Sequence, residues 1–319
     1  MMKKTVLIYI LALLLALPSC APAQEEARLT VVCTTYPIYL LACSLTEGVE
    51  GVAVERLDTG STSCLHDYSL SMADMKKLER ADVIALNGAG LEEFLEDALQ
   101  TSDARTIDCS QGIALLESLS HSHEEDGHGH DHGHWDPHYW MDPENARIMA
   151  SNLRNYLVLI DPDHAARYES NGVETAEILL RCRETAEALL ETYLPQGAPG
   201  LITFHDGFQY FARAFGLPLL ASVEEEAGSE ASAKEIVEMT ELVKKGGIPV
   251  IFTEKNGSDA TAKAISRETG CRVVPLTMLM DGPDADDPEF GGAEQYFQLC
   301  WNVRSMINGF EGEGTVPNG

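Results

Sequence analysis

The stretch from Pro143 to Leu194 most constrains the fold, because it shows no strand pattern and divides the rest of the chain in two. Apolar residues recur there at helical spacing, and Asp161 followed by Pro162 interrupts the pattern. Pro162 suits the first turn of a second helix. That helix would run about 30 residues, or about 45 Å at 1.5 Å per residue. A helix of this length most simply spans two lobes.

Short β-rich runs alternate with amphipathic segments on both sides of this helical stretch. The predicted strands are 29–35, 52–57, 82–86 and 105–109 in the first half, and 201–204, 249–253 and 272–276 in the second. The predicted helices cover 37–45, 91–99, 208–215, 233–245, 259–269 and 293–307. Ser71 and Asp74 could form a capping pair at the start of another. Strands alternating with helices favour parallel sheets, so the expected fold class is α/β, with two lobes and enough apolar residues for two ordinary cores.

The first residues have the pattern of a secretory signal. Lys3 and Lys4 precede an apolar run that is shorter than the roughly 20 residues needed to cross a bilayer. Cys20 follows the small residue Ser19, as in a bacterial lipobox, which predicts lipid attachment at Cys20 after removal of residues 1–19. We therefore expect an extracytoplasmic, lipid-anchored protein, at the cell surface or in the periplasm. The expected parts are a signal peptide (1–19), a tether (20–28), an N-terminal lobe (29–160), a linker helix (161–195) and a C-terminal lobe (196–319).

The chain is strongly acidic, with 22 Lys and Arg against 51 Asp and Glu and a formal net charge of -29. Such a charge repels the phosphate backbone, so nucleic acid is excluded as a partner. An acidic surface also concentrates cations, but it does not select a particular ion.

A histidine-rich loop expected at 120–135 gives the first indication of chemistry. Its histidines alternate with small and acidic residues that cannot pack into a core, and they are His121, His123, His128, His130, His132 and His134. His138 differs, because Trp135, Pro137 and Trp140 surround it and favour a fixed, partly buried backbone. We interpret the two features as a metal-gathering loop that leads into a rigid metal ligand. A solvated polar loop without a ligand role is the alternative.

Two more histidines follow predicted strands, at the position where open α/β sheets place their ligands. His66 lies in the loop after strand 52–57, and His205 directly follows strand 201–204. Asp281 lies beyond the last predicted strand. With His138, each half then contributes two candidates, so facing lobes could bring all four into one cleft. No local spacing joins them, and each could instead be a surface or a core side chain.

The cysteines other than Cys20 show no close pair such as C-x-x-C, which argues against a zinc ribbon. They are Cys33, Cys43, Cys64, Cys109, Cys182, Cys271 and Cys300. Outside the cytoplasm some could form disulfides, and Cys271 with Cys300 is one possible pair. The odd total leaves at least one thiol free.

Several motifs point the same way: His66 with Asp67 and Tyr68, the acidic histidine-rich loop, Asp136 to His138 with Asp142 and Pro143, Phe204 to Asp206, and Glu268 to Gly270 through to Leu276. Together they resemble the zinc-binding solute-binding lipoproteins of bacterial metal ABC importers, over essentially the whole mature chain. The resemblance implies two Rossmann-like lobes with parallel sheets, joined by one long helix, with the metal site in the inter-lobe cleft. It implies three ligand histidines, at His66, His138 and His205, and an acidic fourth ligand at Asp281. The usual neighbours of that acid are replaced here by Met280, Gly282 and Pro283.

The same resemblance implies a monomeric receptor, not an enzyme, that captures Zn(II) and delivers it to a membrane permease. Three nitrogens and one oxygen suit tetrahedral Zn²⁺, whereas manganese prefers more oxygen ligands. Water, Glu224, Glu225 or Glu226 could take the fourth place in the absence of Asp281. A receptor or adhesin of the same fold for manganese or another divalent metal is the first alternative. A zinc-dependent hydrolase is the second, although the chain has neither an H-E-x-x-H nor a G-x-S-x-G motif.

Overall fold

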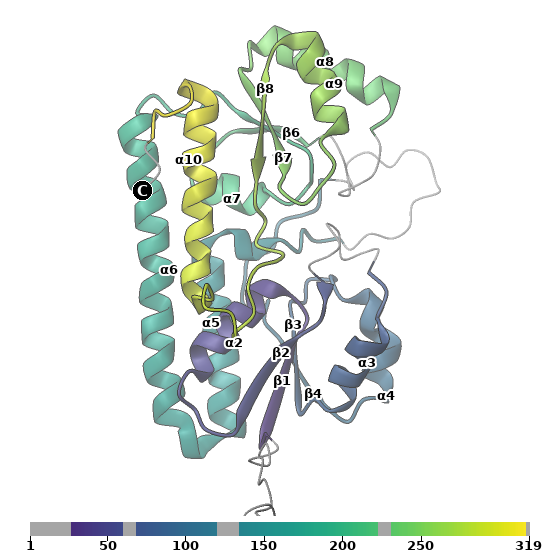
Figure 1. Ribbon diagram of the computed structural model, residues 1–319, viewed down its shortest axis with the longest axis vertical. Helices are drawn as coiled ribbons and strands as arrows, with labels where there is room; N and C mark the ends of the chain where they lie inside the picture. The colour runs from purple at the N-terminus through teal and green to yellow at the C-terminus, as the bar shows by residue number, and fades with distance from the viewer. Residues whose placement is uncertain (1–26, 60–67, 120–133, 223–230, 317–319) are drawn as a thin grey trace, which may run out of the picture.

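The computed structural model describes residues 27–59, 68–119, 134–222 and 231–316, and two four-stranded sheets organise them (Figure 1). The first sheet has the order β2-β1-β3-β4 and consists of β1 (Leu29–Cys33), β2 (Val52–Arg56), β3 (Val83–Leu86) and β4 (Arg105–Asp108). The second has the order β6-β5-β7-β8 and consists of β5 (Leu201–Thr203), β6 (Leu219–Ser222), β7 (Val250–Glu254) and β8 (Arg272–Leu276). All of these strand pairs are parallel. The predicted α/β class with two parallel sheets is therefore confirmed.

Both sheets are covered on both faces, as parallel sheets require. Successive side chains of a strand point to opposite faces. In β1, Val31 belongs to the largest core cluster, whereas Val32 packs on the other face of the sheet. In β7, Phe252 belongs to the same large cluster, whereas Ile251 packs in a separate outer one.

Helices supply this cover (Figure 1). They are α2 (Tyr36–Thr46), α3 (Met72–Glu79), α4 (Glu96–Thr101), α5 (Pro143–Ile160), α6 (Ala165–Tyr193), α7 (Gln209–Ala214), α8 (Ala233–Gly246), α9 (Ala260–Thr269) and α10 (Gln298–Glu311). Helix α6 has 29 residues and runs alongside both lobes, as the helical spacing predicts. Ser71 and Asp74 form the complete capping box at the start of α3.

The hydrophobic core is continuous between the lobes. One cluster of buried side chains includes Val31 of the first sheet, Phe252 of the second and Leu179 of α6. The structure thus differs from the expected pair of ordinary cores, because α6 packs against α2 and α5 of the first half and α10 of the second. Among the described residues, only the outer face of each sheet has a cluster of its own. A close-packed core of this kind resists wide separation of the lobes.

Three local predictions differ from the structure, and one is the helix expected at 293–307, which begins as the 3-10 turn Gly292–Phe297 before α10. The sequence pattern misses β6, a four-residue strand at the edge of the sheet in which Leu220 is exposed and the other residues are partly buried. The helix expected at 91–99 is instead a 3-10 turn, Glu93–Leu95, followed by the short α4.

The disulfide suggested between Cys271 and Cys300 is wrong. Both are free thiols, and they lie in different core clusters because they come from opposite faces of the second sheet. Cys300 instead faces Cys182 of α6, with 3.9 Å between the two sulfur atoms. Cys64 lies outside the described residues.

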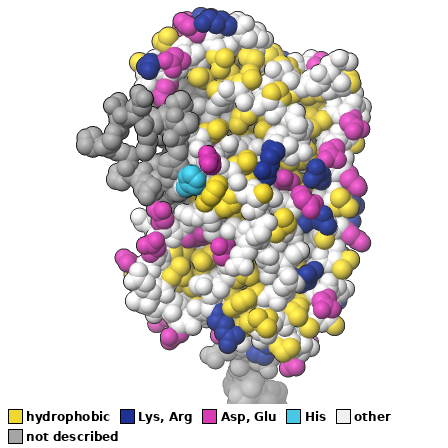
Figure 2. Space-filling model, turned by 180° about the vertical axis from the view of Figure 1, so that it is seen from behind, with side chains coloured by type: hydrophobic (Ala, Val, Ile, Leu, Met, Phe, Trp, Pro, Cys, Tyr) yellow, Lys and Arg dark blue, Asp and Glu magenta, His cyan; other side chains and the backbone are white. Residues whose placement is uncertain are grey.

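No helix within the described ranges is long and apolar enough to cross a bilayer. The predicted signal peptide and the predicted lipidation site at Cys20 lie outside those ranges. On the face drawn in Figure 2, acidic side chains are scattered over both lobes.

Asp161 closes the junction between α5 and α6. Its carboxylate accepts hydrogen bonds from Nη1 and Nη2 of Arg28, at 2.9 and 2.8 Å. It also accepts from the hydroxyl of Tyr168 at 2.7 Å and from Nδ1 of His164 at 3.0 Å. Burial by itself would raise the pKa of this carboxyl, but these hydrogen bonds outweigh it and lower the pKa of Asp161 to about 2.

We expect Asp161→Asn to lower the free energy of unfolding by roughly 2 kcal/mol at pH 7. Because the folded-state pKa lies below the unfolded value, this stabilisation is full above that unfolded value and is lost as the pH falls toward 2. Urea unfolding of both proteins at pH 7, 5 and 3 measures the difference, which should shrink with acidity. Asp163→Asn, at an exposed neighbour, is the control and should change little. A difference that stays constant down to pH 3 would contradict this account.

Candidate metal centre

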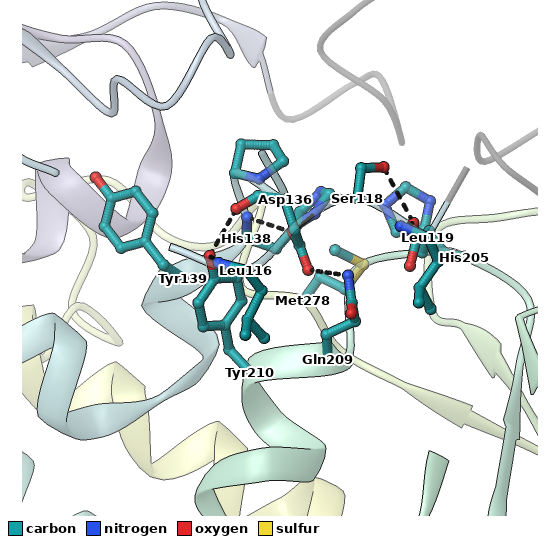
Figure 3. Close-up of polar contacts among 12 residues, drawn as sticks. Leu116, Ser118, Leu119, Asp136, His138, Tyr139, His205, Gln209, Tyr210 and Met278 are labelled. Carbon is teal, nitrogen blue, oxygen red and sulfur yellow. Dashed lines mark hydrogen bonds and ion pairs between the residues drawn. The ribbon is translucent and has the colours of Figure 1, made fainter. Parts of the chain in front are cut away.

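His138 and His205 meet between the two lobes. His205 follows β5 and is buried, with 2% of its surface exposed, and His138 precedes the short 3-10 turn Tyr139–Met141. The Nε2 atoms of the two rings are 3.2 Å apart. Residues 67 positions apart in the chain thus present their outer ring nitrogens to the same point (Figure 3).

This spacing suits a shared metal ion. Two nitrogens at zinc's usual bond length, held at the tetrahedral angle, would be roughly 3.3 Å apart. The usual zinc ligands in proteins are neutral imidazole nitrogen, cysteine sulfur and carboxylate oxygen. The donor pair therefore fits Zn(II) in both chemistry and separation.

Asp136 orients the ring of His138. One of its oxygens, Oδ1, lies 2.8 Å from Nδ1 of His138 and accepts the backbone N–H of the same residue at 2.9 Å. A carboxylate can only accept, so Nδ1 carries the ring proton and Nε2 keeps its lone pair for a metal. The other oxygen of Asp136 accepts from Gln209 at 3.0 Å, so the carboxylate lies between His138 and Gln209 in Figure 3.

Two aromatic side chains join the segment around His138 to the C-terminal lobe. Tyr210 donates to the carbonyl of Asp136 at 2.9 Å, and Trp140 donates to the carbonyl of Met278 at 2.9 Å. Met278 lies close to His205: a Cβ on Gly207 would be 2.2 Å from Cε of Met278 and 2.7 Å from Cδ2 of His205. Glycine at position 207 is what allows this close packing.

Two buried carboxylates, Asp74 and Asp206, bind residues next to the ranges 60–67 and 120–133. Asp74 accepts from the backbone of Asp58 at 3.0 Å and the hydroxyl of Tyr68 at 2.6 Å, which flank residues 60–67. Burial would raise the pKa of Asp74, but its hydrogen bonds, led by that from Ser71, lower it. Asp206 accepts from the backbone of Leu119 at 3.0 Å, next to residues 120–133. Burial, followed by the charge of Asp136, raises the pKa of Asp206 to about 6.

Glu254 is a neighbouring acid that the predicted ligand set does not include. Thr203 of β5 pairs with Phe252 of β7, so the segments that carry His205 and Glu254 leave the sheet next to each other. Glu254 is 5% exposed, and within the described residues its Oε2 has no hydrogen-bond partner. Burial raises its pKa to about 7. Its place at the end of a predicted strand is the same signal that identifies His205.

The structure places the remaining predicted residues apart from this pair or outside its described ranges. Asp281 is half exposed and forms an ion pair with Arg56, with 3.2 Å between Oδ1 and Nη1. His134 is exposed, with its Nε2 3.8 Å from a carboxylate oxygen of Glu117. In the described ranges, no three His, Cys, Asp or Glu side chains form a group that could hold a metal. The predicted residues outside these ranges are His66, His121, His123, His128, His130, His132, Glu224, Glu225 and Glu226.

We expect Asp136→Asn to weaken zinc binding by roughly 10- to 100-fold, because an amide holds the ring of His138 less firmly and accepts its proton less well. Competitive zinc titration measures the change. Gln209→Ala removes the partner of the other carboxylate oxygen and a hydrogen bond to the carbonyl of Glu117, but leaves the contact of Asp136 with His138, and should cost less. Equal zinc affinity in Asp136→Asn and the parent protein would exclude this orienting role.

Comparisons with known proteins identify the family of the chain. The family model described as zinc-uptake complex component A, periplasmic (ZnuA), matches residues 31–308. The chain is 30% identical over 285 residues to the zinc-binding lipoprotein AdcA of Streptococcus pneumoniae (strain ATCC BAA-255 / R6), a match that covers 87% of this chain and 56% of AdcA. The chain thus spans about half the length of that relative.

Two further matches extend over nearly the whole of the partner chains. The iron-binding protein YfeA of Yersinia pestis is 27% identical over 298 residues, covering 92% of this chain and 90% of YfeA. A crystal structure of ZnuA has a TM-score of 0.73 at 23% identity and covers 89% of this chain and 99% of that one, which shows a common fold. On the extent of the family match, the chain belongs to the family of the periplasmic component A of zinc-uptake complexes.

Proposed function

We propose that this protein is an extracytoplasmic receptor that binds Zn(II) and delivers it to the membrane permease of an ABC importer. The observation that carries the proposal is the pair of inward-facing Nε2 atoms of His138 and His205, one of them oriented by the buried carboxylate of Asp136. Histidines that bind a metal usually donate their other ring N–H to a carboxylate, as His138 does to Asp136. A histidine exposed on the surface needs no such partner.

The proposed ligand set is His66, His138, His205 and Asp281. The two described histidines supply two of the three nitrogens, and Asp281 supplies an oxygen, which together suit a tetrahedral zinc ion. Anchoring through a lipid at Cys20 would keep the receptor, as a monomer, beside the permease. The segment His121 to His134 would raise the local zinc concentration through weak, exchanging contacts.

The continuous core favours a receptor that captures and releases its ion through loop movement or modest lobe rotation. The cluster that joins Val31, Leu179 and Phe252 would have to be broken for a wide opening. Movement of a loop outside this cluster would leave the core packing intact. Small-angle scattering with and without zinc should then give nearly the same radius of gyration.

Competitive zinc titration of the metal-stripped protein tests the proposal, beside a variant that lacks residues 121–134. We expect one tight site in both proteins. Loss of tight binding with the deletion would place the site in the histidine-rich segment and not between the lobes. Because the iron-binding YfeA is also similar, parallel titrations with Fe(II) and Mn(II) should be included. Tighter binding of either metal than of zinc would change the assigned cargo.

A further inference from the structure

We propose that Arg56 competes with the bound ion for Asp281, and so weakens ion binding to a level from which the ion can be released. The inference rests on the proposed metal site and adds a residue that sets its affinity. Arg56 ends β2 in the N-terminal lobe, whereas Asp281 lies beyond β8 in the C-terminal lobe. The contact therefore joins the two lobes as well as engaging a proposed ligand.

Arg56 binds the turn after β8 with all three of its nitrogens. Nη1 lies 3.2 Å from Oδ1 of Asp281, Nε lies 2.7 Å from Oδ1 of Asp284, and Nη2 donates to the carbonyl of Gly282 at 3.1 Å. A planar guanidinium suits this combination of two carboxylates and one carbonyl. Its side chain is 16% exposed, so these contacts are screened less than those of an ordinary surface ion pair.

Two tyrosines of α2 hold Arg56 and the same turn in place. The guanidinium carbon lies 4.7 Å from the ring centre of Tyr36 and 5.6 Å from that of Tyr39. Tyr36 donates to the carbonyl of Pro283 at 3.1 Å, and the hydroxyl of Tyr39 accepts the backbone N–H of Ala285 at 2.8 Å. The turn is thus docked by groups other than Arg56, so losing the guanidinium would free the carboxylate without releasing the whole turn.

Close packing of the turn depends on a glycine next to Asp281. A Cβ at Gly282 would lie 2.3 Å from the hydroxyl of Tyr36. Glycine at position 282 therefore lets the turn pack directly against the ring of Tyr36.

The competition requires Asp281 to move between Arg56 and the metal site. Its side chain is 49% exposed, and Met278, three residues earlier, packs close to His205. Three residues of extended chain span about 10 Å. Between them, the buried Leu279 has a φ of 57°, a left-handed conformation that costs a leucine free energy. The segment between Asp281 and the histidine pair therefore contains one strained, fully buried residue.

The competition has a direct consequence for uptake. An ion that takes Asp281 must displace Arg56, so part of the favourable binding free energy is offset by the lost ion pair. When the ion leaves, Arg56 can take the carboxylate back. A receptor that both captures and delivers its cargo needs a limit of this kind on its affinity.

A double-mutant cycle on zinc affinity tests the inference, with Arg56→Gln, Asp281→Asn and both together. We expect Arg56→Gln to tighten zinc binding roughly threefold to tenfold. Asp281→Asn should weaken it, and adding Arg56→Gln to Asp281→Asn should change nothing further. The visible spectrum of the Co(II)-loaded protein should change with Asp281→Asn and should stay unchanged with Arg56→Gln.

Arg80→Gln is the matched control, because Arg80 forms an ion pair with Glu55, the residue before Arg56, at a more exposed position. It should leave zinc affinity unchanged, and circular dichroism should show all variants folded. If Arg56→Gln has no effect, or the same effect with and without Asp281, Arg56 is not a competitor. Absence of any tight zinc site in the parent protein would instead remove the proposed function itself, so the two failures are distinguishable.

Discussion

His205→Ala is expected to weaken zinc binding by roughly 100- to 1,000-fold. A four-ligand zinc site in a protein is worth about 10–16 kcal/mol, so one ligand accounts for about a quarter of that free energy. His205 is buried, and its Nε2 lies 3.2 Å from that of His138, which leaves no room for another residue to replace it without rearrangement. His138→Ala should have an effect of similar size for the same reason.

Competitive titration against a chelator measures this loss. The matched control is His164→Ala, because His164 pairs with Asp161 at the start of the linker helix and contacts neither ring. Zinc affinity should be unchanged in the control. If His205→Ala retains the parent affinity while deletion of residues 121–134 abolishes it, the two histidines are not the zinc site.

Trp140→Ala is expected to lower the free energy of unfolding by roughly 3–5 kcal/mol, the usual cost of truncating a large core aromatic. Trp140 is fully buried and donates to the carbonyl of Met278, so it joins the segment of His138 to the segment that follows β8. Its ring centre also lies 5.2 Å from that of His138. The variant therefore loses core packing and a contact between the two halves of the site.

Urea unfolding measures this change, and two other substitutions separate its causes. Trp140→Phe keeps an aromatic ring but removes the indole donor, and should cost about 1–2 kcal/mol. Trp301→Ala truncates a tryptophan that is 43% exposed on α10, and should cost much less than Trp140→Ala. Equal losses at positions 140 and 301 would show that burial of Trp140 is not what stabilises the fold.

Prediction from sequence worked best where the signal is local. The helical spacing after Pro162 predicts α6, and the pair Ser71 and Asp74 predicts a helix cap that the structure contains. It failed for β6, because four residues at the edge of a sheet are too few to show a period. It also failed for the cysteines, because connectivity between distant thiols has no local signature.

At the candidate site, aromatic and proline neighbours single out His138, the end of a predicted strand singles out His205, and the structure brings the two histidines together. The orienting role of Asp136 has a weak local signal, since it lies two residues before His138. The contact between Arg56 and Asp281 has none, because 225 positions separate them and nothing in the sequence singles out Arg56. The predicted roles of His66 and of the histidine-rich segment stay predictions.

The sequence by itself determined the α/β class, the long helix and the residue types available to bind a metal, because periodicity and strand ends are properties of short segments. Only the tertiary structure decided that the inner core is continuous between the lobes, that Nε2 of His138 faces Nε2 of His205, and that Asp281 is held by Arg56. These are contacts between segments far apart in the chain. Their distances depend on how α6 and α10 pack against both sheets, and no local pattern encodes that packing.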